Sequence, residues 1–389
     1  MLIGFTVENF RSFLNETSLS MMATSDKEHR EFNVISTEQN DLLKSVIIYG
    51  ANAGGKSNLI QAMYYMQKMV SSSIDAQTEH IKHCQPFAFR EDATNLPVKF
   101  EISFLLENIL YEYGFSILDG QINKEYLYKK SKRRTLVFDR TSPSYEHIRL
   151  TPDMEDVESL KKNVRNDVLF LTWAAYANNK TAINIVDWIT KKLLILGFDE
   201  HYGKITLVDD MRINKYFVNF PKKADKDIVD IKLKSSQLMS SYWQYDENWD
   251  KIKTIDVPFE LYSSDGTKRM LDLSDAFFKA LAGTAVIVID EMDLHLHPSL
   301  VRHLLAIVNS IAHNPKNAQL ICTTHDVMLL DEDIRRDQIW FVDKNEYGVS
   351  SLYSLSDFKD VRKSNDIFKR YLLGVYGAIP DLRREDGNE

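Results

Sequence analysis

The amino-acid sequence predicts an α/β fold, with a parallel sheet at its core and an antiparallel meander beside it. A short apolar run over residues 46–49 is followed by a glycine-rich loop and a stretch of helical period, which indicates a strand, a loop and a helix in succession. A second apolar run, over residues 285–289, has the continuous hydrophobic character of a strand buried on both faces. Apolar and polar residues alternate in segments between Val98 and Phe138, which is typical of antiparallel strands.

Length and composition indicate a globular protein of two lobes or domains. The chain has 389 residues, of which 44% are hydrophobic and 27% are charged, so it can bury a large core. Two cysteines, Cys84 and Cys322, are typical of a reducing compartment rather than of a disulfide framework. The N-terminus lacks the pattern of a signal peptide, and no apolar stretch reaches the length of a membrane span. We therefore expect a cytoplasmic protein without membrane contacts.

The charge balance bears on nucleic-acid partners. A net charge of −8 does not indicate nucleic-acid binding, which would require a local basic patch. One basic run, Lys-Lys-Ser-Lys-Arg-Arg at residues 129–134, lies at a tip of the meander. We interpret it as a solvated hairpin turn rather than as a contact to phosphates, because charged residues are common in such turns.

The glycine-rich loop matches the phosphate-binding motif G-x-x-x-x-G-K-S without a mismatch. The motif and the residue after it comprise Gly50, Ala51, Asn52, Ala53, Gly54, Gly55, Lys56, Ser57 and Asn58. Glycines let backbone N–H groups surround a phosphate, and the positive end of the following helix strengthens that field. We expect Lys56 to contact the β- and γ-phosphates of ATP and Ser57 to bind Mg²⁺. The alternative, a glycine-rich turn that binds no ligand, is disfavoured by the strand–loop–helix context.

Two further polar segments complete a hydrolytic site. Asp290 and Glu291 end the apolar run at 285–289, so that Asp290 could hold Mg²⁺ and Glu291 could polarise the attacking water. His325 follows another apolar run, at the strand end where α/β proteins bind ligands, and could contact the γ-phosphate. The plainer interpretations are an acidic strand end and a structural histidine. Ala182 stands where the guanine-reading motif N-K-x-D requires a carboxylate, so GTP specificity is not supported.

A serine-rich segment upstream of Asp290 has two interpretations. Ser264 and Gly266 precede a helical stretch over residues 270–280, and they form a second helix N-terminus that could bind an anion. Because the loop at Lys56 already provides one such end for the γ-phosphate, the second would serve a partner subunit. The other interpretation is an ordinary serine N-cap, and the residues alone leave both open.

The order of these motifs resembles one family of ATPases. The motifs are Glu-Asn-Phe-Arg-Ser-Phe at 8–13, the loop at 50–57, Ser-Ser-Asp-Gly-Thr-Lys at 263–268, Ile-Asp-Glu-Met-Asp followed by Leu-His-Leu-His-Pro at 289–298, and Thr-Thr-His-Asp at 323–326. In this order they resemble ABC-type ATPases of the RecF/SMC/OLD kind, and specifically the compact bacterial AAA_15-type ATPases. The segments at 335–342, 353–358 and 374–380 resemble the ATPase subunit of AbiL/RloA-like abortive-infection systems.

The resemblance implies an ABC-type P-loop ATPase head with a helical insertion lobe. Residues 1–150 would form an N-terminal ATPase lobe with the Walker A loop and the meander. Residues 151–250 would form a mainly helical insertion, and residues 251–389 a C-terminal ATPase lobe with the signature, the Walker B strand and the switch histidine.

In that family two ATP molecules lie between two heads. The resemblance therefore assigns the signature residues to the nucleotide of the opposite subunit, and these residues are Ser263, Ser264, Gly266 and Lys268. It assigns the switch to His325 and the loop after Walker B to Asp293, and it leaves Gln85 as the candidate for the Q-loop. His295 and His297 belong to the same loop after Walker B and have no metal-ligand set around them.

Two functions follow from this resemblance. The first is an anti-phage defence ATPase, a homodimer or larger assembly that uses ATP to control a toxic effector. OLD-type relatives carry a Toprim nuclease after the ATPase, whereas this chain ends soon after its last motif, so we expect a nuclease encoded nearby to act in trans. The alternative is a RecF/SMC-like ATPase of DNA repair or maintenance, which the negative net charge disfavours. A transporter ATPase would need membrane segments, and a non-hydrolysing scaffold would not need Lys56, Asp290 and Glu291 together.

Overall fold

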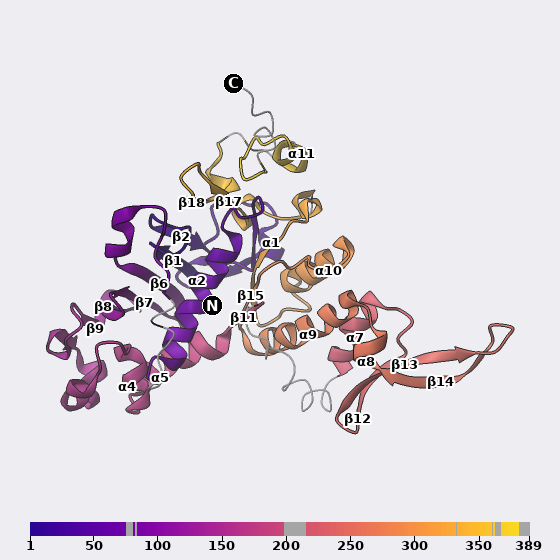
Figure 1. Ribbon diagram of the computed structural model, residues 1–389, viewed down its shortest axis with the longest axis horizontal. Coiled ribbons are helices and arrows are strands. Elements are labelled where there is room, and N and C mark those ends of the chain that lie inside the picture. The colour runs from indigo at the N-terminus through magenta and orange to yellow at the C-terminus, as the bar shows by residue number, and fades with distance from the viewer. Residues whose placement is uncertain are drawn as a thin grey trace.

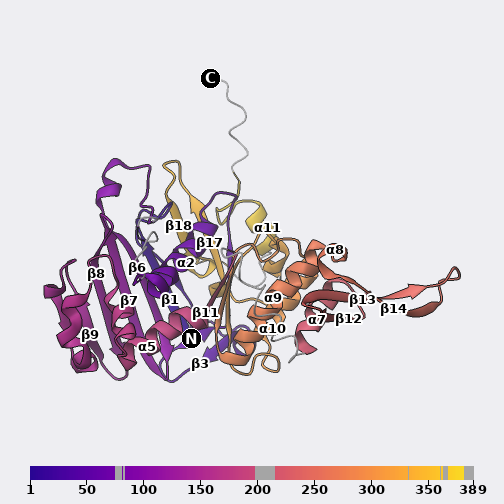
Figure 2. The ribbon, with the colours of Figure 1, turned by 60° about the horizontal axis from the view of Figure 1, so that its bottom comes forward.

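The structure is a computed structural model that describes residues 1–74, 81, 84–197, 215–331, 333–359, 361 and 367–380. Two large sheets form its body, and the helix α2 (Lys56–Ser72) packs against both of them (Figure 1). Further helices cover the outer face of the second sheet, and a smaller three-stranded sheet projects from the side of the molecule (Figure 2).

The first large sheet is antiparallel throughout. In spatial order its strands are β10 (Ile148–Leu150), β9 (Arg134–Arg140), β8 (Gln121–Lys130), β7 (Ile109–Leu118), β6 (Val98–Leu106), β1 (Leu2–Glu8) and β2 (Thr17–Ser20). Strands β6 to β9 follow one another along the chain and pair in sequence, which confirms the predicted meander. Two cations of the basic turn have partners, because Lys129 pairs with Asp153 and Arg134 pairs with Glu112.

The second large sheet carries the phosphate-binding loop. In spatial order its strands are β11 (Leu193–Leu196), β15 (Val286–Ile289), β16 (Gln319–Thr323), β5 (Ser45–Tyr49), β17 (Ile339–Lys344) and β18 (Ser350–Ser354). All neighbours in it are parallel except β18, which runs antiparallel to β17. The carboxyl ends of the parallel strands therefore meet along one edge, where ligands bind in α/β folds.

The apolar strands of this sheet are buried on both faces. In β5, Val46 and Ile48 pack with α2 in one core, whereas Ile47 and Tyr49 pack in a second core with α9 (Asp265–Gly283) and α10 (Pro298–Asn309). Alternate residues of a strand point to opposite faces, so a strand between two helical layers must be apolar at every position. This is the physical reason for the continuous apolar runs in the sequence.

The remaining elements are short. They are β3 (Val34–Ser36), β4 (Asp41–Leu43), α1 (Arg30–Asn33), α4 (Phe170–Tyr176), α5 (Lys180–Asp187), α7 (Lys215–Ala224), α8 (Phe259–Tyr262), α11 (Ile367–Leu372), and single turns or short 3-10 helices at Glu91–Asn95, Tyr145–His147, Pro152–Asn163, Val327–Asp331, Arg336–Gln338 and Leu355–Asp357. Within the described ranges, no helix has both the length and the apolar character that crossing a bilayer requires.

The three-stranded sheet forms an arm. Its strands are β12 (Asp230–Lys234), β13 (Gln237–Tyr245) and β14 (Lys251–Pro258), and Figure 1 shows the β13–β14 hairpin extending away from the body. A small core of its own joins the base of the arm to α9 through Ile231, Phe259 and Leu271. In the sequence, the arm and the short helix α8 immediately precede the predicted signature segment, which begins at Ser263.

The expected helical insertion over residues 151–250 differs from the structure in two places. Ile185, Trp188, Ile189 and Leu193 have the spacing of one helical face, which predicts a single helix through them. The structure differs, because a π-helical turn at Trp188–Lys192 ends the helical part and Leu193 begins strand β11. Four consecutive apolar residues suit a strand buried on both faces, and β11 joins the central sheet beside β15. Residues 230–245 belong to the arm rather than to helices. The division of the chain into three parts stays a prediction.

Candidate nucleotide-binding site

The glycine-rich loop has the predicted position between β5 and α2. Its backbone turns sharply, with a positive φ at Ala53 (60°) and at Gly55 (121°). The Lys56 ammonium donates to the carbonyl oxygens of Gly50 at 2.8 Å and Ala51 at 3.2 Å, so the lysine lies folded over its own loop. Burial lowers the pKa of Lys56, while the carboxylates that follow β15 act in the opposite direction.

Two loop glycines are required by close packing against strand β17. A Cβ atom at Gly50 would overlap the carbonyl oxygen of Val342, and one at Gly54 would lie 3.1 Å from the same oxygen. Because the obstacle is backbone, it cannot rotate away as a side chain could. The glycine spacing of the motif thus lets β17 approach the loop closely.

A cavity of about 460 Å³ brings the loop together with residues from distant parts of the chain. Its lining includes the loop from Ala51 to Asn58 and three other residues, which are Glu291, His325 and Lys344. These three follow or end the strands β15, β16 and β17. Of the predicted catalytic side chains, Lys56, Glu291 and His325 therefore share one cavity.

The two acids after β15 are positioned by a threonine of the neighbouring strand. The buried Thr323 hydroxyl donates to Asp290 Oδ1 at 2.6 Å and accepts from the backbone N–H of Glu291 at 2.7 Å. Glu291 has a positive φ of 52°, which is unusual for a residue other than glycine and turns the chain at the strand end. Thr323 therefore holds this bend, and with it the direction of both carboxylates.

Asp293 holds the loop that carries the histidine. Its Oδ1 accepts from the Thr324 hydroxyl at 2.7 Å, and both of its oxygens lie 3.2 Å from the backbone nitrogen of His325. The loop after β15 is thereby joined to the loop after β16. The exposed His325 side chain lies at the cavity, where it is free of the core.

The signature segment lies at the start of α9 and does not line this cavity. Ser264 caps the helix, because its hydroxyl accepts from the backbone N–H of Thr267 at 3.2 Å. Gly266 lies against the loop after Glu291, where a Cβ would be 2.7 Å from the carbonyl oxygen of His295. The Lys268 ammonium lies 4.0 Å from Asp265. The serine N-cap is thus present, and the anion-binding role stays a prediction.

Comparison with known proteins identifies the family. Residues 45–331 match the model of the AAA_21 family, described as "AAA domain, putative AbiEii toxin, Type IV TA system". The chain belongs to this family. The match begins at β5 and ends after the His325 loop, so it contains the whole predicted site. The predicted P-loop ATPase fold, with a mixed sheet and an antiparallel meander, is confirmed.

Two solved structures are similar to this AAA chain at low identity. One is the SMC head bound to the C-winged helix domain of ScpA, with 16% identity, a TM-score of 0.48, and coverage of 91% of this chain and 97% of that chain. The other is the SMC head domain from Thermotoga maritima, with 15% identity, a TM-score of 0.42, and coverage of 91% and 98%.

The AAA family implies a nucleotide, usually bound with Mg²⁺, and the residues present fit that ion. Ser57 offers a hydroxyl and Asp290 a carboxylate, which are the hard oxygen donors that Mg²⁺ prefers. One oxygen of Asp290 accepts from Thr323, which leaves the other for a metal-bound water. No group of three or more acidic, histidine or cysteine side chains gathers as a metal centre in the described part, and Mg²⁺ at nucleotide sites needs only one or two carboxylates.

The other candidate residues lie elsewhere. The exposed Gln85 does not line the cavity, and its backbone oxygen accepts from the N–H of Arg11 at 2.9 Å. Asn179 caps helix α5, because its side-chain oxygen accepts from the backbone N–H of Ala182 at 2.8 Å. The Asn-Lys-Thr-Ala stretch is thus explained as a helix start and needs no role in guanine binding. His297 caps α10, because its Nδ1 accepts from the backbone N–H of Ser299 at 3.2 Å. The Q-loop assignment of Gln85 stays a prediction.

Two serines that support the loop were missed by the sequence analysis as site residues. The Ser350 hydroxyl donates to the carbonyl oxygen of Gly54 at 2.6 Å, and its oxygen lies 2.8 Å from the hydroxyl oxygen of Ser12. Ser12 in turn accepts from the Asn58 amide at 2.7 Å. Ser12 belongs to the N-terminal motif Asn-Phe-Arg-Ser-Phe, which could have indicated it, whereas Ser350 has no motif around it.

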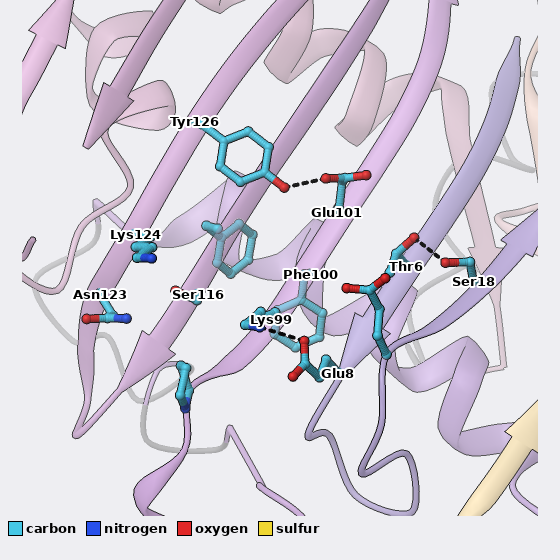
Figure 3. A pocket seen from close by; sticks show the side chains of 13 residues that line it. Thr6, Glu8, Ser18, Lys99, Phe100, Glu101, Ser116, Asn123, Lys124 and Tyr126 are labelled. Carbon is cyan, nitrogen blue, oxygen red and sulfur yellow. Dashed lines mark hydrogen bonds and ion pairs between the residues drawn. The ribbon is translucent and has the colours of Figure 1, made fainter. Parts of the chain in front are cut away.

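A second cavity, of about 310 Å³, lies on the outer face of the antiparallel sheet (Figure 3). Its charged side chains are mostly satisfied by one another: Lys99 pairs with Glu8 at 2.6 Å, and the Tyr126 hydroxyl donates to Glu101. It contains none of the predicted site residues.

Proposed function

We propose that this AAA protein binds ATP with Mg²⁺ at the glycine-rich loop and hydrolyses it. The observation that carries the proposal is the single cavity shared by the loop, Glu291 and His325. These residues come from three segments far apart in the sequence, and a phosphate-binding loop, an acid and a histidine at one cavity are groups that phosphoryl transfer uses, which supports the proposal. A glycine-rich turn without a function would not need an acid and a histidine at the same edge of the sheet.

The proposed chemistry assigns one task to each side chain. Glu291 accepts a proton from the attacking water, and the water oxygen forms a bond to the γ-phosphorus. The bond between the γ-phosphorus and the β-γ bridging oxygen breaks, which releases ADP. Lys56 and the backbone N–H groups of the loop stabilise the charge on the phosphate oxygens. Ser57 and Asp290 would hold Mg²⁺, which would neutralise phosphate charge, and His325 would contact the γ-phosphate.

We further propose that the signature segment of one chain completes the site of a second copy. Ser263, Ser264, Gly266 and Lys268 lie outside the cavity of their own chain, at a helix N-terminus that could receive a phosphate. Large apolar side chains next to this segment are exposed, and they are Leu261, Tyr262 and Leu294. Exposed apolar residues beside polar ones are typical of protein interfaces, which supports a homodimer here.

The biological role that we propose is control of an effector in bacterial anti-phage defence, as in AbiL/RloA-like systems. The family description, which names a toxin of a toxin–antitoxin system, supports a defence role and does not address the AbiL/RloA likeness. An effector nuclease encoded nearby would act in trans.

Glu291→Gln and Lys56→Ala test the proposed binding and hydrolysis of ATP. Glu291→Gln removes the proton acceptor and keeps the shape, so turnover should fall by about a hundred-fold or more while ATP stays bound and a dimer accumulates. Lys56→Ala should weaken ATP binding itself. Phosphate release, titration calorimetry and light scattering with and without ATP measure these effects, with Glu112→Gln on the meander as the matched control. Equal turnover of wild type and Glu291→Gln would show that Glu291 is not the base.

The proposed role has a separate experiment. The protein is purified together with the product of the neighbouring gene, and their association is measured with and without ATP. An ATP-dependent change in association supports effector control. Strong stimulation of ATP turnover by DNA, in the isolated protein, would instead indicate DNA repair or maintenance.

A further inference from the structure

The nucleotide cavity contains a second lysine that no sequence motif marks. Lys344 is the last residue of β17 and lines the cavity together with the glycine-rich loop. In the order of the sheet, β15 and β16 lie on one side of β5, and β17 lies on the other. Glu291 and His325 therefore approach the loop from one side, and Lys344 approaches it from the opposite side.

The backbone of Lys344 is held firmly against the loop. Two residues earlier, the carbonyl oxygen of Val342 packs against Gly50 and Gly54. Lys344 is paired with Ser350 in the β17–β18 register, and Ser350 donates to the carbonyl oxygen of Gly54 at 2.6 Å. The base of the Lys344 side chain is thus fixed relative to the phosphate-binding backbone.

Within the part of the chain that the structure describes, the ammonium of Lys344 forms no ion pair. Across the described residues, no carboxylate lies within 4.0 Å of it, although lysines elsewhere, such as Lys99 and Lys129, form ion pairs at 2.6 Å. The neighbouring Asp343 carboxylate accepts from the backbone N–H of Lys344 at 2.9 Å. An unpaired cation on the wall of a cavity already built for phosphate attracts a further phosphate oxygen.

We propose that Lys344 is a second phosphate-binding cation of this site, so that the site takes nucleoside polyphosphates held between two lysines. Lys56 holds the phosphate chain within the loop, and Lys344 holds it from the β17 side. This inference rests on the proposed nucleotide binding and adds a residue to it. The alternative is a solvated lysine at the end of a hairpin, which would contribute nothing to affinity.

The test compares the ATP affinity of four proteins by titration calorimetry, namely wild type, Lys344→Ala, Lys344→Arg and Lys124→Ala. Lys344→Ala should weaken ATP binding by about ten-fold, because it removes a charge-assisted hydrogen bond. Lys344→Arg should restore affinity to within about three-fold. Lys124, an exposed lysine on the outer face of the meander, serves as the matched control and should bind as wild type does.

Two readouts separate phosphate binding from a structural role. The Kd of wild type should depend more steeply on salt concentration than that of Lys344→Ala, because one interaction between charges is missing in the variant. The unfolding midpoint without nucleotide should be unchanged. Affinity of Lys344→Ala within two-fold of wild type would overturn the inference, as would a loss that Lys344→Arg does not restore. Failure of wild type itself to bind ATP would instead overturn the proposed function.

Discussion

Thr323 shows how a single buried side chain organises the site. Its hydroxyl contacts both acids: it donates to the Asp290 carboxylate and accepts from the backbone N–H of Glu291. Thr323 itself does not line the nucleotide cavity, so we do not expect it to contact the phosphates. Its effect on chemistry must therefore act through the placement of the two acids.

Replacing Thr323 by valine keeps the size of the side chain and removes both hydrogen bonds. We expect turnover to fall by about ten-fold or more, because small displacements of catalytic groups slow phosphoryl transfer, while the Kd for ATP changes by less than about three-fold. Single-turnover phosphate release and calorimetry measure the two effects.

The control for this variant is Thr172→Val. Thr172 is also buried, and its hydroxyl donates to the carbonyl oxygen of Val70 at 2.8 Å, near the far end of α2. Its turnover should match that of wild type. Unchanged turnover in Thr323→Val would show that the bridge does not position Glu291.

At the scale of elements, a buried carboxylate joins the meander to helix α4. Glu125 on β8 accepts from the backbone N–H groups of Phe170 and Leu171 at 2.6 and 2.9 Å, and from the Tyr113 hydroxyl at 3.0 Å. Burial raises the pKa of Glu125, and the nearby Arg140 acts in the opposite direction. The two N–H groups belong to the first turn of the helix, where backbone N–H groups have no hydrogen-bond acceptor within the helix itself.

Glu125→Ala should lower the free energy of unfolding by about 2–4 kcal/mol, because it leaves two helix N–H groups and a tyrosine hydroxyl buried without partners. Urea denaturation measures the change. Glu112→Ala removes a carboxylate from the exposed pair with Arg134 and should cost less than about 1 kcal/mol. Similar losses in the two variants would contradict this account of α4.

The hairpin of β17 and β18 contributes residues to the site that the nucleotide-binding motifs do not include. Its backbone packs on Gly50 and Gly54, its Ser350 holds the loop, and its Lys344 faces the cavity. Strand β5, which leads into the glycine-rich loop, lies between β16 and β17, and the loop itself packs against the β17–β18 hairpin.

At the scale of the whole molecule, the arm contributes no residue to the two large cores in the part of the chain that the structure describes. The end of its hairpin exposes large side chains, which are Trp243, Tyr245, Trp249 and Ile252. Figures 1 and 2 both show this end far from the two large sheets. Only the base of the arm shares a core with α9.

Replacing residues 245–252 by Asn-Gly should leave the fold intact, because Gln244 and Lys253 lie opposite each other and a two-residue turn can join them. We expect the unfolding midpoint to shift by less than about 2 °C, since little buried surface is lost, and ATP turnover to stay within two-fold of wild type. Scanning calorimetry and phosphate release measure both. A large loss of stability would mean that the tip packs on the body.

The sequence by itself determined the elements whose signals are local. The loop at 50–57, the apolar strands and the acids after β15 are each specified by neighbouring residues, because phosphate binding needs glycines and a lysine at set spacing and doubly covered strands need continuous apolar side chains. The alternation of the meander likewise predicted its strands.

Only the tertiary structure decided which distant residues meet at the site. Lys344 and Ser350 lie almost 300 residues after the loop, and no spacing rule connects them to it. The spacing of Leu193 predicted a helical stripe, and its pairing beside β15 places it in a strand instead. These outcomes depend on how the strands are ordered across the sheet, which arises from packing between segments and leaves no periodic pattern in the chain.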